Sequence, residues 1–231
     1  MNAVEIFYRQ LVEYQGYKIV LTGLKNTAII AVFGLLIGLL LGCILATAKI
    51  LPKTNRFVKF VSGIVDVYVA IFRGTPMVVQ LLLIHFVFLP ARVMPISPIA
   101  KAVIAFGLNS AAYVSEIIRG GILSVDIGQT EAGRALGLNY GKTMIKIVLP
   151  QAIKNVIPTL GNEFIALLKE TSVVSFIAVT DITKSFQNIA QSTYEYMIPY
   201  IVLALVYLVL VLAVTGLIKL VERRLRASDK R

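Results

Sequence analysis

"TEAGRALGLNYGKTMIKIVLPQA", residues 130–152, is a polar insert rich in small residues, within a chain of 231 residues that is otherwise largely apolar. Its first half is made mostly of good helix formers, and Gly137 is able to take the left-handed conformation that ends a helix. Asn139 is a good N-cap for a second helix, and Pro150 either stops that helix or restarts the chain. The stretch therefore predicts a helix, a turn and a second helix.

Two uses of this insert are compatible with its residues. Ala132, Gly133 and Ala135 present a thin surface, which lets the backbone of another protein come close. Alternatively, Lys142 and Lys146 suit an amphipathic loop that lies on a lipid surface. The local pattern leaves both interpretations open.

The composition of the rest of the chain is typical of a membrane protein. Hydrophobic residues make up 58% of the sequence, which exceeds the roughly half found in soluble domains. Residues 28–46 and 197–218 contain no charged residue, and each has about the 20 residues that cross the hydrocarbon. Three less uniform runs, at about 60–89, 98–118 and 156–179, carry polar or charged residues. We therefore expect an all-α membrane protein with five transmembrane helices.

The basic residues set the expected orientation. With the N-terminus outside, the inner segments hold most of the 23 lysines and arginines, including Arg119 and the cluster that begins at Lys219. The outer segments keep Arg9, Lys18, Lys25, Arg92, Lys101 and Lys184. We expect the N-terminus outside, the C-terminus in the cytoplasm, and the insert in a cytoplasmic loop over about residues 120–150. The basic excess is then a topology signal, and no nucleic-acid partner is expected.

Composition and motifs exclude several classes of function. One cysteine and one histidine exclude a disulfide framework and a His/Cys metal cluster, so we expect no metal site. The sequence has no G-x-x-x-x-G-K-[ST] phosphate loop, so the chain does not hydrolyse ATP by that device. His85 has no acid partner in view, and we interpret it as a packed, hydrogen-bonded residue. We expect no catalytic residues and no enzyme activity.

Polar side chains inside the predicted spans are costly and suggest function. Asn162 and Glu163 lie in one span, and Asn109 lies in the preceding one. The carboxylate of Glu163 is suited to receive an ammonium or guanidinium group of a small zwitterion. The alternative for the two asparagines is interhelical hydrogen bonding. Glu116, beside Arg119 near the inner end, is interpreted as part of a structural ion pair.

"FRGTPMVVQ", residues 72–80, breaks the second span with a glycine and a proline. Backbone groups freed in this way are tolerated only against protein or water. Half-helix ends of this kind bind charged groups in transporters, so Arg73 and Thr75 are candidate ligands of an α-carboxylate, and Gln80 closes the same stretch. The alternative is a kink in which Arg73 is tied to a carbonyl or to Asp66.

The insert resembles the EAA motif of the membrane subunits of bacterial ABC importers. The matching positions are Glu131, Ala132, Gly133, Gly137, Ile147, Leu149 and Pro150. Gly133 departs from the motif, in which alanine is usual, and loosens the helix by up to about 1 kcal/mol. The resemblance implies a coupling helix that sits in a groove of an ATP-hydrolysing partner, with contacts from Glu131, Ala132, Gly133, Ala135, Leu136 and Gly137.

Together with "FRGTP" and with "GNEFIALLKETSVVSFIAV", residues 161–179, the insert resembles the polar amino-acid permeases of the histidine/glutamine/arginine type. The resemblance covers roughly residue 22 to the C-terminus. It implies the type I ABC importer permease fold, as a single transmembrane domain over residues 1–231 with a core of about 22–220. It also implies a multi-pass protein of the bacterial plasma membrane.

The same resemblance implies partners. Two permease subunits, copies of this chain or of a paralogue, form the pathway between a solute-binding protein outside and two ATPase subunits below. The ATPases bind ATP and Mg, so no cofactor is expected in this chain. The expected substrate-binding residues are Glu163, Asn162, Arg73, Thr75, Asn109 and Gln80.

The cargo is not fixed by these residues. Glu163 favours a basic amino acid such as arginine, histidine or lysine, but it would equally hold the α-ammonium of glutamine. A glutamine/glutamate permease of the same family is therefore an alternative. A secondary amino-acid carrier is the alternative from another class, although such folds usually show an internal repeat, and none is visible in this sequence.

Gly34, Gly38 and Gly42 recur at four-residue spacing in the first span. Small residues at this spacing let two helices approach closely. The contact they predict lies either within the fold or at the seam with a second subunit.

Overall fold

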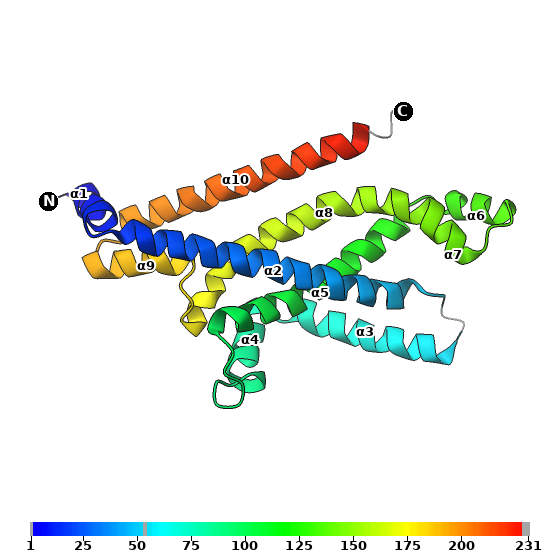
Figure 1. The fold of residues 1–231 in the computed structure, drawn as a ribbon, viewed down its shortest axis with the longest axis horizontal. Helices are drawn as coiled ribbons and strands as arrows, with labels where there is room; N and C mark the ends of the chain where they lie inside the picture. Colours follow the sequence, from blue (N-terminus) through cyan, green and yellow to red (C-terminus); the bar gives the residue numbers. More distant parts are fainter. Residues whose placement is uncertain (1, 53–54, 228–231) are drawn as a thin grey trace.

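The computed structural model describes residues 2–52 and 55–227, and these form helices and no strand (Figure 1). In chain order the elements are α1 (Ala3–Tyr8), η1 (Arg9–Glu13), α2 (Gly16–Ile50), α3 (Arg56–Gly74), α4 (Met77–Leu82), η2 (Leu83–Phe88), α5 (Pro98–Leu123), α6 (Ile127–Ala135), α7 (Tyr140–Thr143), η3 (Met144–Val148), α8 (Leu149–Glu170), η4 (Thr171–Ile177), α9 (Ile182–Thr193) and α10 (Met197–Ala227). The prediction of an all-α protein holds for the described residues.

The long helix α2 and the buried helix α5 run side by side in the same direction (Figure 1). A Cβ atom added at Gly38 would lie 2.6 Å from Ser110 Cβ, and one added at Gly42 would lie 2.7 Å from Val114 Cβ. The glycine repeat therefore serves a contact within one chain, because any side chain there would force the two helices apart. The same contacts place Ser110 of α5 at the depth of Gly38, and Val114 at the depth of Gly42.

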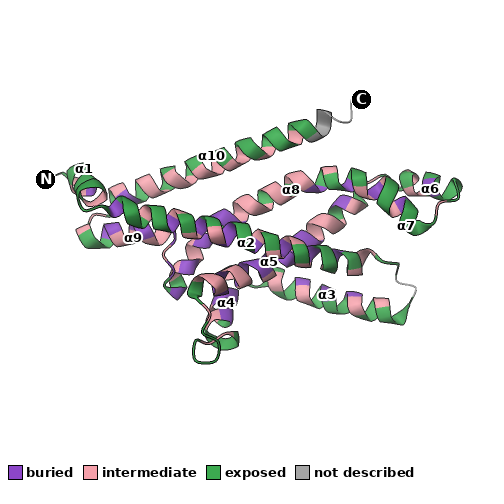
Figure 2. Cartoon of the chain, viewed as in Figure 1, coloured by how far each residue is buried: buried purple, intermediate pink, exposed green. Residues whose placement is uncertain are grey.

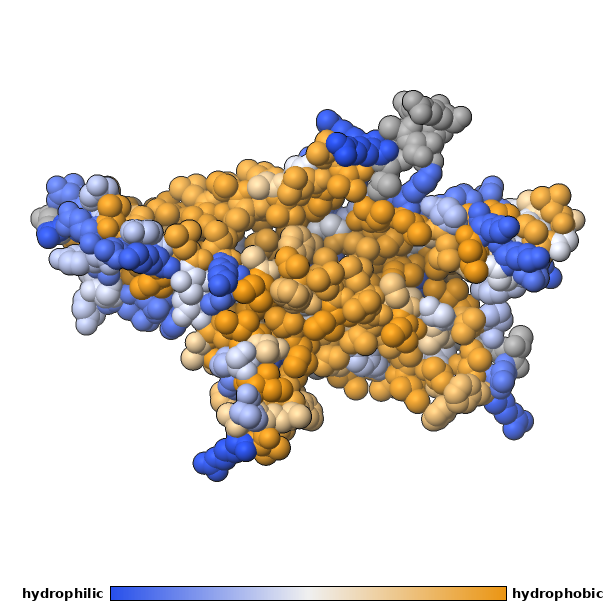
Figure 3. All heavy atoms as spheres, viewed as in Figure 1, coloured by the Kyte–Doolittle hydropathy of each residue, from blue (hydrophilic) through white to orange (hydrophobic). Residues whose placement is uncertain are grey.

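The molecule has an apolar middle and two polar ends (Figure 3). We call the end that carries α6 and α7 the α6 end, and the opposite end, which carries α1 and α9, the α9 end (Figure 1). Between them α2 exposes apolar side chains such as Val32, Phe33, Leu36 and Leu40. By length and composition α2 and α10 are apolar enough to cross a membrane, and the bent pair of α3 with α4 and η2 is a third candidate.

Burial is concentrated on α5 and is slight on α10 (Figure 2). α5 packs against α2, α3 and α8, whereas α10 touches α8, α9 and α1 along one side only. α5 is therefore the centre of the bundle, and α10 leaves most of its apolar surface uncovered.

α3 and α4 form an interrupted pair with a bend of 107° at the break. α3 runs from the α6 end towards the middle of α2, and α4 then turns aside with η2 and the connection 89–97 (Figure 1). Pro76 precedes the first residue of α4 and supplies no backbone N–H, so the ladder of α3 cannot continue through it. The break predicted from "FRGTP" is confirmed.

At the α9 end, the chain between η4 and α9 is tied to α2. Asn26 Nδ2 donates to Thr180 O at 2.8 Å, across 154 residues of sequence. The fully buried Asp181 caps α9 by accepting from the backbone amides of Thr183 and Lys184. These bonds fix α9 beside the start of α2.

The helix, turn and helix predicted for the insert are confirmed as α6, the turn and α7. Gly137 has φ of 75°, and the side chain of Asn139 accepts from Lys142 N at 2.9 Å. The second helix does not stop at Pro150, because α7 continues through the π-helical turn η3 into α8. Pro150 is the second residue of α8 and follows the π-helical turn directly, so its missing N–H falls where the hydrogen-bond register of the helix changes.

The span expected at 156–179 differs from the structure. α8 begins earlier, at Leu149, and ends at Glu170, after which η4 is a 3-10 turn closed by Ala178 with φ of 59°. Threonine, serine and two valines follow Glu170, and their β-branched or hydroxyl side chains disfavour an α-helix. The apolar run of this stretch is therefore shared between a helix and a turn.

Two glycine substitutions test the seam between α2 and α5. We expect Gly38→Ala to lower the free energy of unfolding by about 1–3 kcal/mol, because its Cβ meets Ser110. Gly63→Ala, in α3, has no atom within 4 Å of the added Cβ and is expected to stabilise by up to about 1 kcal/mol. Thermal unfolding of both variants in detergent is the measurement. Shifts of the same sign for both would contradict the close α2–α5 contact.

Candidate functional site

Polar side chains from α5 and α8 meet at the depth of Gly38, near the middle of the uncharged stretch 28–46 of α2. Ser110 of α5 faces Gly38, and its Oγ donates to Glu163 Oε1 of α8 at 3.2 Å. Glu163 is half-buried and has no basic partner within ion-pair distance among the described residues. A carboxylate thus lies at mid-depth with only one hydroxyl as its partner.

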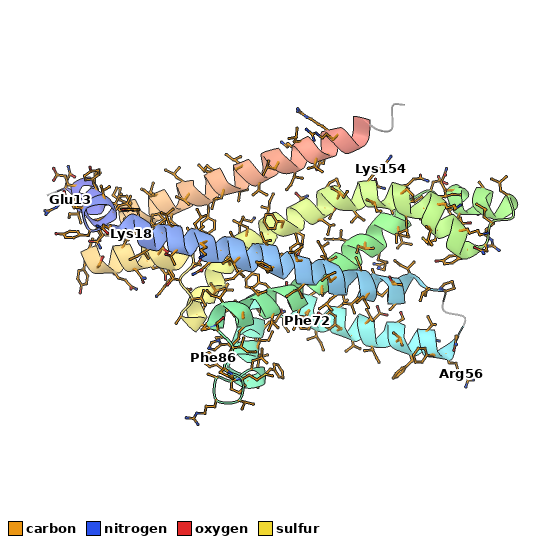
Figure 4. All side chains as sticks on the ribbon, in the orientation of Figure 1. Glu13, Lys18, Arg56, Phe72, Phe86 and Lys154 are labelled. Carbon is orange, nitrogen blue, oxygen red and sulfur yellow. The ribbon has the colours of Figure 1, made fainter. Side chains whose placement is uncertain are left out.

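The break between α3 and α4 lies at a similar depth and is filled by the amide of Gln80. Gln80 Nε2 donates to Phe72 O at 2.8 Å, to Thr75 O at 3.0 Å and to Thr75 Oγ1 at 2.9 Å. Phe72 marks this position in Figure 4, where α3 ends beside α5. Gln80 is only 6% exposed, so its amide replaces the hydrogen bonds that the broken helix loses.

Asn109 of α5 completes this arrangement. Its Nδ2 donates to Gln80 Oε1 at 2.8 Å and to Phe72 O at 3.4 Å, and the residue is 4% exposed. The structure therefore brings Asn109, Gln80 and Thr75 together, as the predicted site requires. Their polar groups bond mainly to one another and to the backbone of the break. These three residues therefore hold the broken helix in place.

Arg73, Thr75 and Asn162 are the exposed members of the predicted site. The guanidinium of Arg73 lies over the ring of Tyr113, with Cζ 5.3 Å from the centroid. The tie to Asp66 that the alternative interpretation requires is not formed, since Asp66 bonds to Lys49 instead. Asn162 is exposed and makes no hydrogen bond to the described part of the chain.

The arrangement separates opposite charges at one depth. Glu163 offers a carboxylate from α8, and Arg73 offers a guanidinium from the end of α3. A small zwitterion has the complementary pair of groups, so this geometry is suited to bind one. Sequence reasoning missed the hydroxyl of Ser110, because its pairing with Glu163 joins helices 53 residues apart.

A cluster of four charges lies at the α6 end of the same helices. Lys49 Nζ contacts Asp66 Oδ1 at 2.8 Å and also bonds to Glu116, whose other oxygen accepts from Arg119 Nη2 at 2.7 Å. The predicted pair of Glu116 with Arg119 is confirmed. Lys49 and Asp66 were not foreseen, because their contacts depend on how α2, α3 and α5 pack.

Next to this cluster, a cavity of about 610 Å³ separates the ends of α2 and α5 from the insert. Lys49, Arg119, Asp126, Thr130 and Tyr140 are among its lining residues. Ile127 and Thr130 are the residues of α6 that line this cavity.

α6 exposes most of the residues that the EAA resemblance implies. Glu131, Ala132, Ala135 and Leu136 are exposed, with Leu136 at 80%. Gly133 is buried instead, and a Cβ there would lie 2.7 Å from Thr143 Cγ2. The glycine at a position where alanine is usual therefore lets α6 pack on α7 and η3, and it supports the exposed surface from behind.

Comparison with known proteins gives consistent matches over nearly the whole chain. The family model described as "Binding-protein-dependent transport system inner membrane component" matches residues 34–227. The arginine transport system permease protein ArtQ of Bacillus subtilis (strain 168) is 44% identical over 210 residues, which cover 91% of this chain and 94% of that protein. The glutamine transport system permease protein GlnP of Escherichia coli (strain K12) is 34% identical over 211 residues, covering 90% and 93%.

Solved structures match in fold as well. A crystal structure of an amino acid ABC transporter with histidines is 40% identical, with a TM-score of 0.84, and covers 94% of this chain and 98% of its own. The MetNI methionine ABC transporter, in an inward-facing form, is 19% identical with a TM-score of 0.69, and the match covers 94% and 97%. The second likeness concerns the fold alone.

The hydrogen bonds of Gln80 give a prediction on stability. We expect Gln80→Leu to lower the free energy of unfolding by about 2–3 kcal/mol, because it leaves buried carbonyls of the break without a donor. Gln191→Leu, at an exposed position of α9, serves as the matched control and is expected to change little. Thermal unfolding of the purified proteins is the measurement, and equal effects of the two substitutions would contradict the capping role of Gln80.

Proposed function

Because the chain belongs to the family of binding-protein-dependent transport system inner membrane components, and is the permease of an amino-acid ABC importer, we propose that it forms the translocation pathway for basic amino acids. Arginine, lysine and histidine are the proposed cargo. The chain itself is not catalytic, since ATP hydrolysis belongs to a separate subunit in this family.

The observation that carries this proposal is the carboxylate of Glu163 at mid-depth. A carboxylate inside a membrane is costly unless it meets a cation or water, and its one described hydrogen bond comes from Ser110. A guanidinium or ammonium group of the cargo satisfies it with a charge-assisted bond. Two relatives support the same cargo class: the permease that is 44% identical is named for arginine, and the solved transporter that is 40% identical is described with histidines.

Arg73 is proposed to bind the α-carboxylate of the cargo. Its guanidinium lies over the ring of Tyr113, and Thr75 follows it closely at the break. Gln80 and Asn109 act as positioning residues, because they fix the backbone on which Arg73 and Thr75 lie. Asn162, exposed beside Glu163, completes the proposed site.

We place five crossings in the membrane, formed by α2, α3 with α4, α5, α8 and α10, with the α9 end outside. The basic side chains at the α6 end, among them Arg134, Lys142 and Lys146, support the inner position of that end. Tyrosines gather at the other end, as is typical of a membrane interface: Tyr8, Tyr14, Tyr17, Tyr194, Tyr196 and Tyr200. The membrane is then the bacterial inner membrane.

The exposed side of α6 is proposed as the coupling surface for the ATPase. Leu136, with Ala132 and Ala135 beside it, gives an apolar patch with little bulk, and Gly137 ends the helix there. Two ATPase subunits, which hold ATP and Mg, would dock on two permease subunits. A solute-binding protein would deliver the cargo at the α9 end.

A glutamine permease is the second candidate, and the similarity to permeases named for glutamine favours it. In that case Glu163 holds the α-ammonium group that all amino acids share. The two candidates differ in which cargo depends on the charge of Glu163.

The substitution Glu163→Gln separates them. We expect it to reduce arginine-stimulated ATP hydrolysis by about 10- to 100-fold, because one charge-assisted bond is lost. The measurement uses liposomes that contain the permease and its ATPase, with the binding protein and one amino acid added at a time. Glu222→Gln, on α10 towards the α6 end, is the matched control and should retain full activity.

Unchanged arginine-stimulated turnover in Glu163→Gln would contradict the role of Glu163. If glutamine alone stimulates the wild type, the glutamine permease replaces the basic one.

Leu136 gives a separate prediction on the ATPase contact. We expect Leu136→Ser to weaken ATPase binding at least about tenfold. Leu136 is exposed in this chain, and an apolar side chain that becomes buried on binding carries much of the energy of such an interface. Val93→Ser, similarly exposed at 75% but in the connection between η2 and α5, is expected to leave binding unchanged. Binding of the purified ATPase to each permease variant in detergent decides the point, and normal binding by Leu136→Ser would rule out this surface.

A further inference from the structure

The exposed side chains of α8 form a polar stripe. Beyond Ile153, every exposed residue of this helix is polar, and these residues are Asn155, Thr159, Asn162, Lys169 and Glu170. The spacings of four, three and seven residues from Asn155 to Lys169 place them on one face of the helix. We call Asn155, Thr159 and Asn162 the neutral stripe, because they carry amide and hydroxyl groups and no charge.

Two other long helices show what a face towards lipid contains. α10 exposes Ile201, Leu205 and Leu212, and the uncharged stretch 28–46 of α2 exposes Phe33 and Leu40. These faces are apolar because hydrocarbon offers no hydrogen bonds. The exposed face of α8 has the opposite character over a comparable length.

Polar groups inside the bundle are different again, because protein covers them. Gln80 and Asn109 are buried and bond to the break. Nδ1 of His85, in η2, is buried and has no hydrogen-bond partner within the ranges 2–52 and 55–227, contrary to the interpretation of His85 as hydrogen-bonded. The neutral stripe is exposed instead, so its groups are available to a molecule outside the chain.

The neutral stripe is unsuited to lipid. α8 is one of the five proposed crossings, and the inference rests on that placement. Amide and hydroxyl groups that leave water for hydrocarbon lose hydrogen bonds and gain none, and polar side chains of crossing helices therefore face protein or a water-filled cavity. The face of α8 that carries the neutral stripe is accordingly the one turned to the pathway.

The neutral stripe leads from the candidate cargo site to the α6 end. Asn162 lies beside Glu163, and Thr159 and Asn155 follow at one turn each towards the start of α8. From Glu163 to Asn155 the helix rises by about 12 Å. The neutral stripe thus covers most of the distance between mid-depth and the inner end of the bundle.

A cavity of about 330 Å³ lies where the neutral stripe ends. Asn155, Ser124 and Asp126 are among its lining residues, together with Lys154, which is labelled in Figure 4. Asn155 Nδ2 donates to Ser124 Oγ at 2.9 Å, so the stripe is joined there to the end of α5. Asp126 is the N-cap of α6, and the cavity therefore borders the proposed coupling element.

The chemistry of the neutral stripe suits passage better than capture. An amide both donates and accepts, so it meets the carboxylate and the ammonium group of an amino acid alike. Asn155 keeps its Oδ1 free of partners among the described residues, and Asn162 makes no bond to them. Conduction needs sites that bind weakly enough to release, and neutral groups do not form the charge-assisted bond that Glu163 offers.

We propose that the neutral stripe is the inner part of the cargo route, along which an amino acid moves from Glu163 to the cavity beside Asp126. Asn155 and Thr159 thereby join the residues that contact the cargo. The route ends next to α6, so release takes place beside the surface assigned to the ATPase. The proposal does not depend on which amino acid is transported.

The test uses the single cysteine of the chain. Cys43 is exposed on α2, about one turn inward of Gly38, just as Thr159 lies one turn inward of Glu163, so the wild type is the matched control. Thr159→Cys and Asn155→Cys are each made with Cys43→Ala. The transporter, assembled with its ATPase in liposomes, is treated with a charged, water-soluble thiosulfonate reagent, with and without ATP.

We expect the thiols of Thr159→Cys and Asn155→Cys to react at least about tenfold faster than Cys43, because the reactive thiolate forms in water and not in lipid. The charged adduct should then stop most of the uptake of the amino acid that stimulates ATP hydrolysis. Reduction of the adduct should restore uptake, and this comparison within one folded protein excludes a defect of folding. Treatment of the wild type should leave uptake unchanged.

Two results would overturn the proposal. Thiols on the neutral stripe that react as slowly as Cys43 would show that lipid or a dry contact with the second subunit covers it. Fast reaction without loss of uptake would show a wet face that lies off the route. Neither result depends on the charge of Glu163, so both are distinct from a failure of the proposed basic cargo.

Discussion

The structure depends on a broken helix whose freed carbonyl groups are satisfied by protein. In a membrane an unpaired carbonyl has no water to bond with, so a break at mid-depth needs its own donors. Gln80 supplies them to Phe72 and Thr75, and Asn109 holds Gln80 in place. The backbone is thereby able to open at one point, and Arg73 emerges there beside Tyr113.

The close contact between α2 and α5 determines the depth at which the polar side chains of the site lie. Glycines on α2 let α5 approach closely enough that Ser110 lies opposite Gly38. Ser110 bonds to Glu163, and Asn109, its neighbour in α5, bonds to the break. Two adjacent residues of one helix therefore bring the acid of α8 and the base of α3 to one depth. This is the basis for proposing a zwitterionic cargo for the site.

Much of this architecture was predictable from the sequence, because it depends on local chemistry. The left-handed Gly137, the cap at Asn139 and the interruption by Pro76 follow from the residues themselves. The partners of Lys49 and the burial of Lys101 depend on packing between distant segments, which a single sequence does not contain. The role of Gln80 as a cap was hidden for the same reason, and the burial of Gly133 explains the departure from the EAA motif only once α7 is in place.

The most direct test of the account is a structure of the assembled transporter with arginine bound in the membrane. We expect density for the guanidinium within bonding distance of the Glu163 carboxylate and for the α-carboxylate near Arg73, at the depth of Gly38. Arginine bound elsewhere along the helices, with Glu163 still bonded only to Ser110, would contradict the central claim that this pair of charges forms the cargo site.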